Sequence, residues 1–349
     1  MNPYKNLPEK AFWKTAVANR NMFDITNLWN PKFNIGPKDN VATYGSCFAQ
    51  HIGRNLALRG CSWLSTEPAP KNTPPQVAQK YNYGIFTSRT GNIYTTTLLQ
   101  QWLEWSFGLK SPPEEIWQKG DRYFDPFRPA VEPNGFSSEE ELLASRQTTL
   151  NAFKRSVETS KYFVFTLGLT ESWVNSEKHY EYPMCPGTVA GEYDSSVHKF
   201  SKKKFFHIRT ALESSIEIMR GINPELKFIL TVSPVPLTAT KSGDHVLVAT
   251  MMSKSTLRAV AGEMAEKFDY VDYFPSYEVI NSAPFKGAFF EPNQRSVNHK
   301  GVELVMSHFF SALEQKYKVK FSINSDQNTT NLDELDVICE EEILQSFSK

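Results

Sequence analysis

Short apolar runs alternate with amphipathic segments along most of the chain. The apolar runs are strand-like in length and are rich in β-branched and aromatic residues. Each precedes a segment whose apolar residues recur at helical spacing. This alternation predicts an α/β protein with a mostly parallel sheet covered by helices on both faces. The predicted strands cover residues 40–45, 162–167, 226–232 and 270–273, and the predicted helices cover residues 48–56, 97–107, 137–157, 205–221, 257–268 and 302–313.

The regular alternation is interrupted at both ends and in two internal stretches. The first 39 residues are aromatic and broken by prolines, and the last 31 are acidic. A short docking helix is predicted over residues 335–347. We expect a single α/β domain over residues 40–318, with an N-terminal extension over 1–39, insertions at about 60–136 and 172–200, and an acidic C-terminal tail over 319–349.

Composition narrows the class of protein further. The 349 residues carry 38 basic and 38 acidic side chains, so no excess of positive charge indicates a nucleic-acid partner. Residues 1–18 contain no apolar signal segment, and no run approaches the roughly 18 apolar residues of a membrane span. The four cysteines form no CxxC pair and no metal-ligand spacing. We therefore expect a cytoplasmic, reduced protein without a metal site or membrane span.

The most informative stretch lies where the first predicted strand ends. Gly45 closes the strand, and a helical pattern begins at Phe48. Ser46 and Cys47 lie between them, so the turn presents two candidate nucleophiles to the positive end of a helix dipole, which favours an anion and lowers the pKa of a thiol. The segments 168–171 and 233–236 follow later strands. Ligands bind beyond the carboxyl ends of parallel strands, so we expect all three segments to meet there.

Residues 45–49, Gly-Ser-Cys-Phe-Ala, resemble the signature that names the GSCFA-domain proteins. The resemblance covers roughly residues 40–310. It continues through Gly91–Tyr94, Asp125–Pro129, Thr166–Glu171, Val232–Pro236 and the stretch around Ser253–Leu257.

The GSCFA family in turn resembles the SGNH/GDSL hydrolases, and this likeness implies a flavodoxin-like, three-layer α/β/α sandwich with hydrolase or acyltransferase activity. In the SGNH pattern Gly-Asp-Ser, Cys47 takes the position of the nucleophilic serine and Ser46 that of the aspartate. A slip of one residue makes Ser46 the nucleophile. The SGNH block Gly-x-Asn-Asp corresponds to Gly168–Glu171, with Thr170 in place of the asparagine that binds the oxyanion.

The last SGNH block, Asp-x-x-His, has no intact counterpart. With His299 as the general base, the aspartate position holds Ser296, and a slip of three residues puts Asn293 and Ser296 at the two positions. His245 is a second candidate base, and His51, one helical turn after Cys47, is a weaker one.

Four further polar residues have a structural and a functional interpretation. Asn92, after Gly91, forms a tight turn or contacts the oxyanion or substrate. Glu171 orients a histidine or caps a helix. Asp125 and Arg128 pin a loop or bind an anionic or sugar ligand, and we favour the structural role for this pair.

Three functions remain open. The leading hypothesis is an acyl-ester enzyme, an esterase or O-acyltransferase acting on a small-molecule or glycan acyl ester without a cofactor. The missing Asp-x-x-His pair favours a second hypothesis, a non-catalytic module that binds a glycan or a partner. The third is an acetyltransferase that uses acetyl-CoA. Neither the substrate nor the oligomeric state follows from the sequence.

Overall fold

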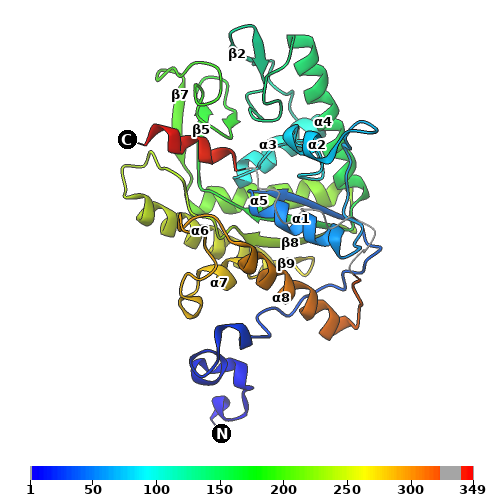
Figure 1. Ribbon diagram of the computed structural model, residues 1–349, viewed down its shortest axis with the longest axis vertical. Helices are drawn as coiled ribbons and strands as arrows, with labels where there is room; N and C mark the ends of the chain where they lie inside the picture. The colour runs from blue at the N-terminus through cyan, green and yellow to red at the C-terminus, as the bar shows by residue number, and fades with distance from the viewer. Residues whose placement is uncertain (1, 323–338, 349) are drawn as a thin grey trace.

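A four-stranded parallel sheet forms the centre of the computed structural model, which describes residues 2–322 and 339–348 (Figure 1). The strand order is β1-β4-β8-β9, and every neighbouring pair is parallel. The alternation of apolar runs and helical segments therefore predicted the sheet correctly. The strands are β1 (Val41–Gly45), β4 (Tyr162–Leu167), β8 (Lys227–Val232) and β9 (Val271–Tyr273).

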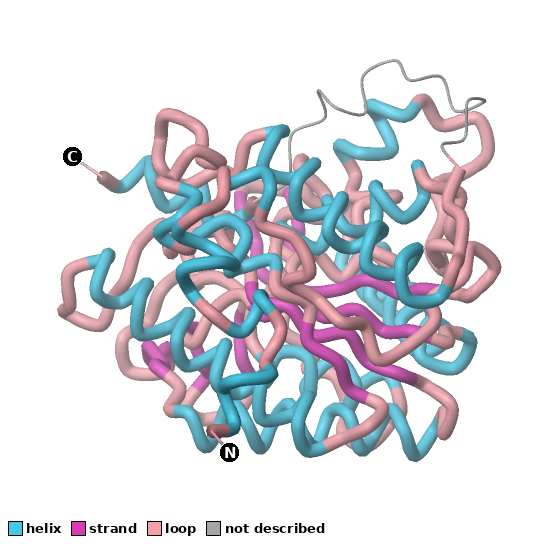
Figure 2. The backbone as a smooth tube through the Cα atoms, turned by 90° about the horizontal axis from the view of Figure 1, so that it is seen from below, coloured by secondary structure: helices cyan, strands magenta, loops and turns pink. Residues whose placement is uncertain are grey.

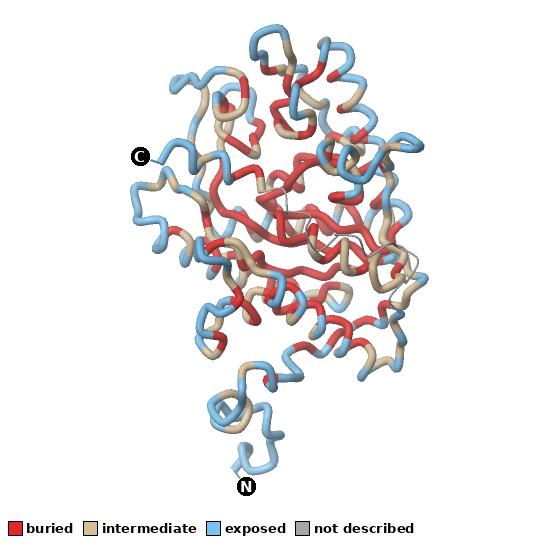
Figure 3. The backbone as a smooth tube through the Cα atoms, in the orientation of Figure 1, coloured by how far each residue is buried: buried red, intermediate tan, exposed pale blue. Residues whose placement is uncertain are grey.

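Helices cover both faces of this sheet, and two apolar cores result (Figures 2 and 3). Alternate residues of a strand point to opposite faces. In β4, Phe163 and Phe165 join the core shared with α3, α4, α5 and α6, whereas Tyr162 and Val164 join the core shared with α1, α7 and α8. Burial on both sides explains why the strands are continuous apolar runs. The α-helices are α1 (Phe48–Leu58), α2 (Pro75–Lys80), α3 (Thr96–Ser106), α4 (Glu139–Thr159), α5 (Phe205–Ile222), α6 (Val246–Lys267), α7 (Ser276–Asn281) and α8 (His299–Tyr317).

Two small antiparallel sheets lie in the segments that interrupt the alternation. One is a hairpin of β2 and β3, and the other has the order β6-β5-β7. Neither sheet was predicted, because their strands are only two to five residues long and their alternation of apolar residues is weak. The strands are β2 (Trp117–Lys119), β3 (Arg122–Phe124), β5 (Glu171–Asn175), β6 (Glu181–Tyr182) and β7 (His198–Lys202).

Helix α4 is capped by Ser138, one residue after Ser137, where the predicted helix starts. The Ser138 hydroxyl, rather than that of Ser137, accepts the helix-capping hydrogen bond from the Glu141 N–H, at 3.2 Å. The Glu141 carboxylate accepts in return from the N–H of Ser137. Within this helix Leu142 is buried in the core, whereas the next residue, Leu143, is exposed.

Both ends of the described chain pack on the α/β core in part. In the N-terminal extension, Trp29 stacks on Phe309 of α8, with ring centroids 5.1 Å apart. The predicted C-terminal helix is a 3₁₀-helix, η6 (Glu340–Phe347), and residues 335–338 lie outside the described part. Among the residues described, no helix is long and apolar enough to cross a membrane. The other short helices are η1 (Pro3–Asn6), η2 (Glu9–Ala11), the π-helix η3 (Lys14–Ala18), η4 (Met22–Asp24) and η5 (Ala283–Phe285).

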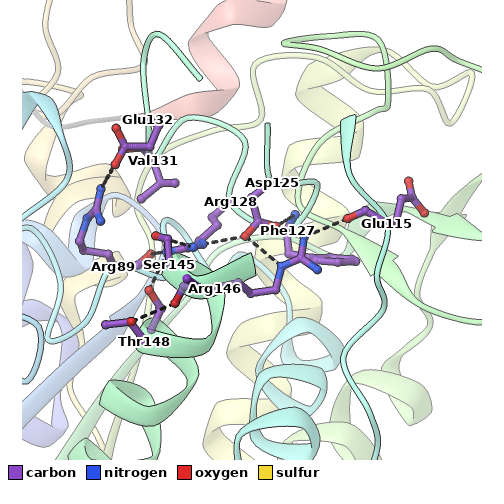
Figure 4. Close-up of polar contacts among 12 residues, drawn as sticks. Arg89, Glu115, Asp125, Phe127, Arg128, Val131, Glu132, Ser145, Arg146 and Thr148 are labelled. Atoms are coloured by element: carbon purple, nitrogen blue, oxygen red, sulfur yellow. Dashed lines mark hydrogen bonds and ion pairs between the residues drawn. The ribbon is translucent and has the colours of Figure 1, made fainter. Parts of the chain in front are cut away.

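A buried ion network ties the loop after β3 to helix α4 (Figure 4). The Asp125 carboxylate accepts from Arg128 Nε at 2.8 Å and from Arg146 Nη2 at 3.0 Å, and all three side chains are buried. Burial raises the pKa of Asp125, but the two guanidinium groups outweigh burial and lower it. Asp125 and Arg128 therefore pin a loop, the role that the sequence analysis favoured.

We predict that Asp125→Asn lowers the free energy of unfolding by about 3 to 5 kcal/mol, because two buried guanidinium groups lose their counter-charge. The lowered pKa means that Asp125 contributes stability above its unfolded-state pKa and that this contribution disappears as the pH falls through the folded-state value. Urea unfolding measures both effects. The control is Asp39→Asn, which breaks a partly exposed pair with Lys161 and costs within about 1 kcal/mol. Equal losses would contradict a stabilising role for the network.

The end of β1 lies unusually close to the end of β4. Gly45 has φ of +128°, and a Cβ there would lie 2.3 Å from the Thr166 carbonyl oxygen. The N–H of the next residue, Ser46, donates to that same oxygen at 3.0 Å. Only glycine therefore allows β1 to leave the sheet at this point.

Gly45→Ala should lower the free energy of unfolding by about 3 kcal/mol or more, because the backbone of β4 must shift. Gly84→Ala is the matched control: its φ of +68° is also positive, but no heavy atom lies within 4 Å of the added Cβ. We expect the control to lose only about 1 to 2 kcal/mol. Similar midpoints of urea unfolding for the two variants would contradict the importance of the Gly45 contact.

Candidate functional site

The carboxyl ends of β1, β4 and β8 surround a small cavity. Ser46 and Cys47 follow β1, Gly168 follows β4, and Ser233 follows β8. The structure thus brings together the three strand-end segments that the sequence pattern placed at one edge of the sheet. The cavity is lined by Ser46, Cys47, Tyr94, Gly168, Leu169, Ser233, Val235, Lys254 and Glu341.

The strand-to-helix turn presents both candidate nucleophiles to this cavity. Cys47 is the residue that precedes α1, and it is 5% exposed. The Ser46 hydroxyl is buried and has no hydrogen-bond partner among the residues that the structure describes. The N–H groups of Ala49 and Gln50 donate to the Ser46 and Cys47 carbonyls, at 2.9 and 3.1 Å, and those of Cys47 and Phe48 come before them at the start of the helix. The turn therefore combines two nucleophilic side chains with N–H donors.

Lys254 is the basic group at the cavity. It lies on α6 and is 1% exposed, and its Nζ donates to the Gly168 carbonyl at 2.8 Å. Burial lowers the pKa of Lys254 to about 8, although Glu341 and Cys47 act to raise it. The sequence analysis assigned it no role. The sequence holds one signal for the burial of Lys254: it lies on the apolar face of α6, three residues before the buried Leu257.

The structure does not bring the candidate histidines to this cavity. His299 is the first residue of α8, its side chain is half-exposed, and its Nδ1 lies 3.6 Å from Glu303. His245 is exposed and caps α6 by accepting the Leu247 N–H at 3.2 Å. His51 is partly buried one turn into α1, and burial lowers its pKa to about 3, with smaller contributions from Arg54 and His299. None of the three is among the residues that line the cavity.

The remaining predicted residues surround the cavity at different depths. Gly168 lines it directly. Thr170 is buried, and its carbonyl accepts from the Lys203 N–H at 2.8 Å. Glu171 accepts from the Thr240 hydroxyl at 2.8 Å, and burial raises its pKa. Asn92 forms no hairpin, since no strand flanks it in the described chain, and it hydrogen-bonds the Glu340 carboxylate.

The C-terminal segment 339–348 covers the cavity, a feature that the sequence analysis missed. The Cys47 thiol hydrogen-bonds the sulfur of Cys339, and Glu341 lines the cavity. This hydrogen bond and burial raise the pKa of Cys47. Arg295 donates to the Cys339 sulfur at 3.3 Å, and the pKa of Cys339 is lowered by the hydrogen bond from Cys47 and by this guanidinium. Cys47 is therefore held as a protonated thiol beneath the segment.

Several buried polar atoms around the cavity lack partners among the described residues. They are Ser46 Oγ, Tyr94 Oη, Arg295 Nε and Glu340 Oε2. Buried polar groups of folded proteins are almost always hydrogen-bonded, so exceptions that gather at one place indicate a functional site. No group of three or more metal-ligating side chains occurs within residues 2–322 and 339–348.

The fold and the site define an α/β protein with a nucleophile-bearing turn and a buried lysine at the carboxyl ends of a parallel sheet. The chain belongs to the GSCFA family, whose model matches residues 40–309. No curated protein and no solved structure matches the chain. Cys47, Lys254 and Arg295 lie within the matched residues, whereas Cys339 and Glu341 lie outside them.

A titration of Lys254 tests the electrostatics of the cavity. We predict a midpoint near pH 8 for its ammonium group in the folded protein, because burial disfavours the charged form. Nuclear magnetic resonance of protein labelled with ¹³C-lysine measures the midpoint, and the loss of one signal in Lys254→Met assigns it. A midpoint at or above the ordinary value of 10.5 would contradict a desolvated lysine.

Proposed function

We propose that the protein is an acyl-ester enzyme, a hydrolase or O-acyltransferase, in which Cys47 is the nucleophile and Lys254 carries the proton. The observation that supports this proposal most strongly is the buried Lys254 on the same cavity as Cys47 and Ser46. A lysine with a pKa near 8 is a competent base at neutral to mildly alkaline pH. Lysine replaces histidine as the base in some serine hydrolases, so an intact Asp-x-x-His pair is not required.

The reaction follows a two-step acyl transfer. The neutral Lys254 amine takes the Cys47 proton while the sulfur attacks the acyl carbon and forms a C–S bond. The C–O bond of the ester then breaks, and the leaving alkoxide takes the proton from the Lys254 ammonium. A water molecule or an acceptor hydroxyl next gives its proton to Lys254 and attacks the thioester. The Cys47 thiolate leaves and recovers that proton.

The oxyanion of each tetrahedral intermediate requires hydrogen-bond donors. The N–H groups of Cys47 and Phe48 are suited to this role because they lie at the nucleophile and at the positive end of the helix dipole, ahead of the Ala49 and Gln50 N–H groups that bond the turn. The Tyr94 hydroxyl is a second donor on the cavity, and it has no partner among the described residues. Thr170, at the asparagine position of the SGNH pattern, and Asn92, the other candidate donor, are not among the cavity-lining residues.

The sheet order supports the likeness to SGNH hydrolases. Residue Trp63 forms a parallel bridge with Val41, on the edge of β1 opposite β4. Counted as a one-residue strand, it extends the order to 2-1-3-4-5, the order of flavodoxin-like sheets. Ligands of such sheets bind where the strand order reverses, which here is the gap between the ends of β1 and β4. Ser46, Cys47 and Gly168 lie at that gap.

We predict that Cys47→Ala and Lys254→Met each lower kcat/KM for p-nitrophenyl acetate by about 10²- to 10⁴-fold, because each removes one partner of the proton transfer. Ser46→Ala should retain activity within about tenfold, since its hydroxyl takes no part in bond formation. The kcat/KM of the wild type should rise with pH and level off above about pH 8, because Lys254 accepts a proton only when neutral.

His299→Ala and His245→Ala are the matched controls, and both should leave kcat/KM unchanged. Loss of activity in Ser46→Ala but not in Cys47→Ala would transfer the nucleophilic role to Ser46. Turnover that survives all of the cavity substitutions would overturn the proposal and favour the non-catalytic binding module.

A further inference from the structure

Segment 339–348, red in Figure 1, supplies Glu341 to the lining of the cavity, although it is not part of the region that matches the family. Two glutamates of the segment are buried in the protein: Glu340 is 7% exposed and Glu341 is 9% exposed. Glu340 contacts Asn92, and its Oε1 lies 2.9 Å from the position that a Cβ at Gly91 would take. The start of the segment is therefore packed into the site and does not merely lie on its surface.

The segment meets two buried cations. Arg295 is 7% exposed, and its Nη2 donates to Glu341 at 3.4 Å, while Lys254 shares the cavity with Glu341. Without the segment, Lys254 would have no acidic residue beside it among those that line the described cavity, and Arg295 would lose the carboxylates of Glu341 and Glu342 that its guanidinium contacts. Uncompensated buried charge is strongly unfavourable, so a negative charge belongs at this position.

The guanidinium of Arg295 also retains an unused donor. Its Nε is buried and has no partner among the described residues, although Nη1 and Nη2 contact Glu342, Glu341 and Cys339. A guanidinium binds a carboxylate or phosphate best through two parallel N–H donors. The Glu341 carboxylate makes a single long contact with Arg295 and so leaves this capacity unfilled.

We propose that Arg295 and Lys254 form an anion-binding subsite beside Cys47, and that Glu341 of the chain's own C-terminal segment occupies this subsite as a stand-in for the ligand. The ligand is a small acyl ester with an anionic group, such as the half-ester of a dicarboxylic acid. The subsite holds the free carboxylate while the ester carbonyl lies at Cys47. Binding requires the segment to leave, so the segment competes with the substrate and keeps Cys47 covered.

The substrate class in this inference rests on the proposed acyl-ester chemistry, but the subsite and its cover do not. Alkylation of Cys47 tests them separately, since it requires access to the thiol and no turnover. Iodoacetate carries a carboxylate and is the anionic probe, and iodoacetamide is its neutral counterpart. Peptide mass spectrometry of the full chain measures both rates at Cys47, each relative to the rate at Cys185, which is partly exposed and outside the site.

We expect Glu341→Gln to raise the rate of Cys47 alkylation by iodoacetate at least about tenfold, the effect of losing one charge-assisted hydrogen bond. The rise with iodoacetamide should be smaller. Glu342→Gln is the matched control, since its half-exposed carboxylate pairs with Arg295 outside the cavity, and it should change either rate less than about twofold.

Adding Arg295→Met to Glu341→Gln should remove the preference for iodoacetate, and Arg295→Lys should retain part of it. The lysine variant keeps the test decisive if the methionine variant does not fold. Unchanged alkylation in Glu341→Gln would overturn the cover. An equal rise with both reagents, independent of Arg295, would overturn the anion-binding subsite.

Discussion

The close contact between Gly45 and Thr166 determines the position of the whole site. Because Gly45 has no side chain, β1 can leave the sheet directly against β4. The hydrogen bond from the Ser46 N–H to the Thr166 carbonyl then holds the turn against the end of β4. Gly168, on the other side, is equally constrained, since a Cβ there would lie 2.8 Å from the Cβ of Ser46. Two glycines thus bring the nucleophile-bearing turn and the carbonyl that holds Lys254 into one small volume.

Charge dominates the chemistry of that volume. A buried lysine is costly, and the cost appears as a pKa near 8. The ammonium group ties α6 to the end of β4 through its hydrogen bond to the Gly168 carbonyl, and the same position fits the proton transfer that we propose. Cys47 stays protonated while Cys339 is docked, because its hydrogen bond to the Cys339 sulfur and burial both raise its pKa. While the segment covers it, Cys47 is therefore a protonated and unreactive thiol. The acyl-ester chemistry that we propose requires the C-terminal segment to move.

The sequence predicted the framework better than the chemistry. The buried strands and the helices that follow them were visible as apolar runs and helical stripes, because both faces of the sheet are covered. The start of α6 was missed, since its first turns are exposed and show no apolar period. The turn of Ser46 and Cys47 was found because a strand-to-helix junction has a local signature. For Lys254 the only signal is its place on the apolar face of α6, and Arg295 has none, because both reach the site through tertiary packing. The role of Glu341 depends on a contact across more than 80 residues of sequence from Lys254.

The most direct test of the central claim is to trap the acyl group on the protein. The full chain is mixed with p-nitrophenyl acetate, quenched in acid, digested and analysed by mass spectrometry. We predict an acetyl group on the peptide that contains Cys47, in wild-type protein and not in Lys254→Met. Turnover of the ester with no adduct on Cys47, or with the adduct on another residue such as Ser46, would contradict the account.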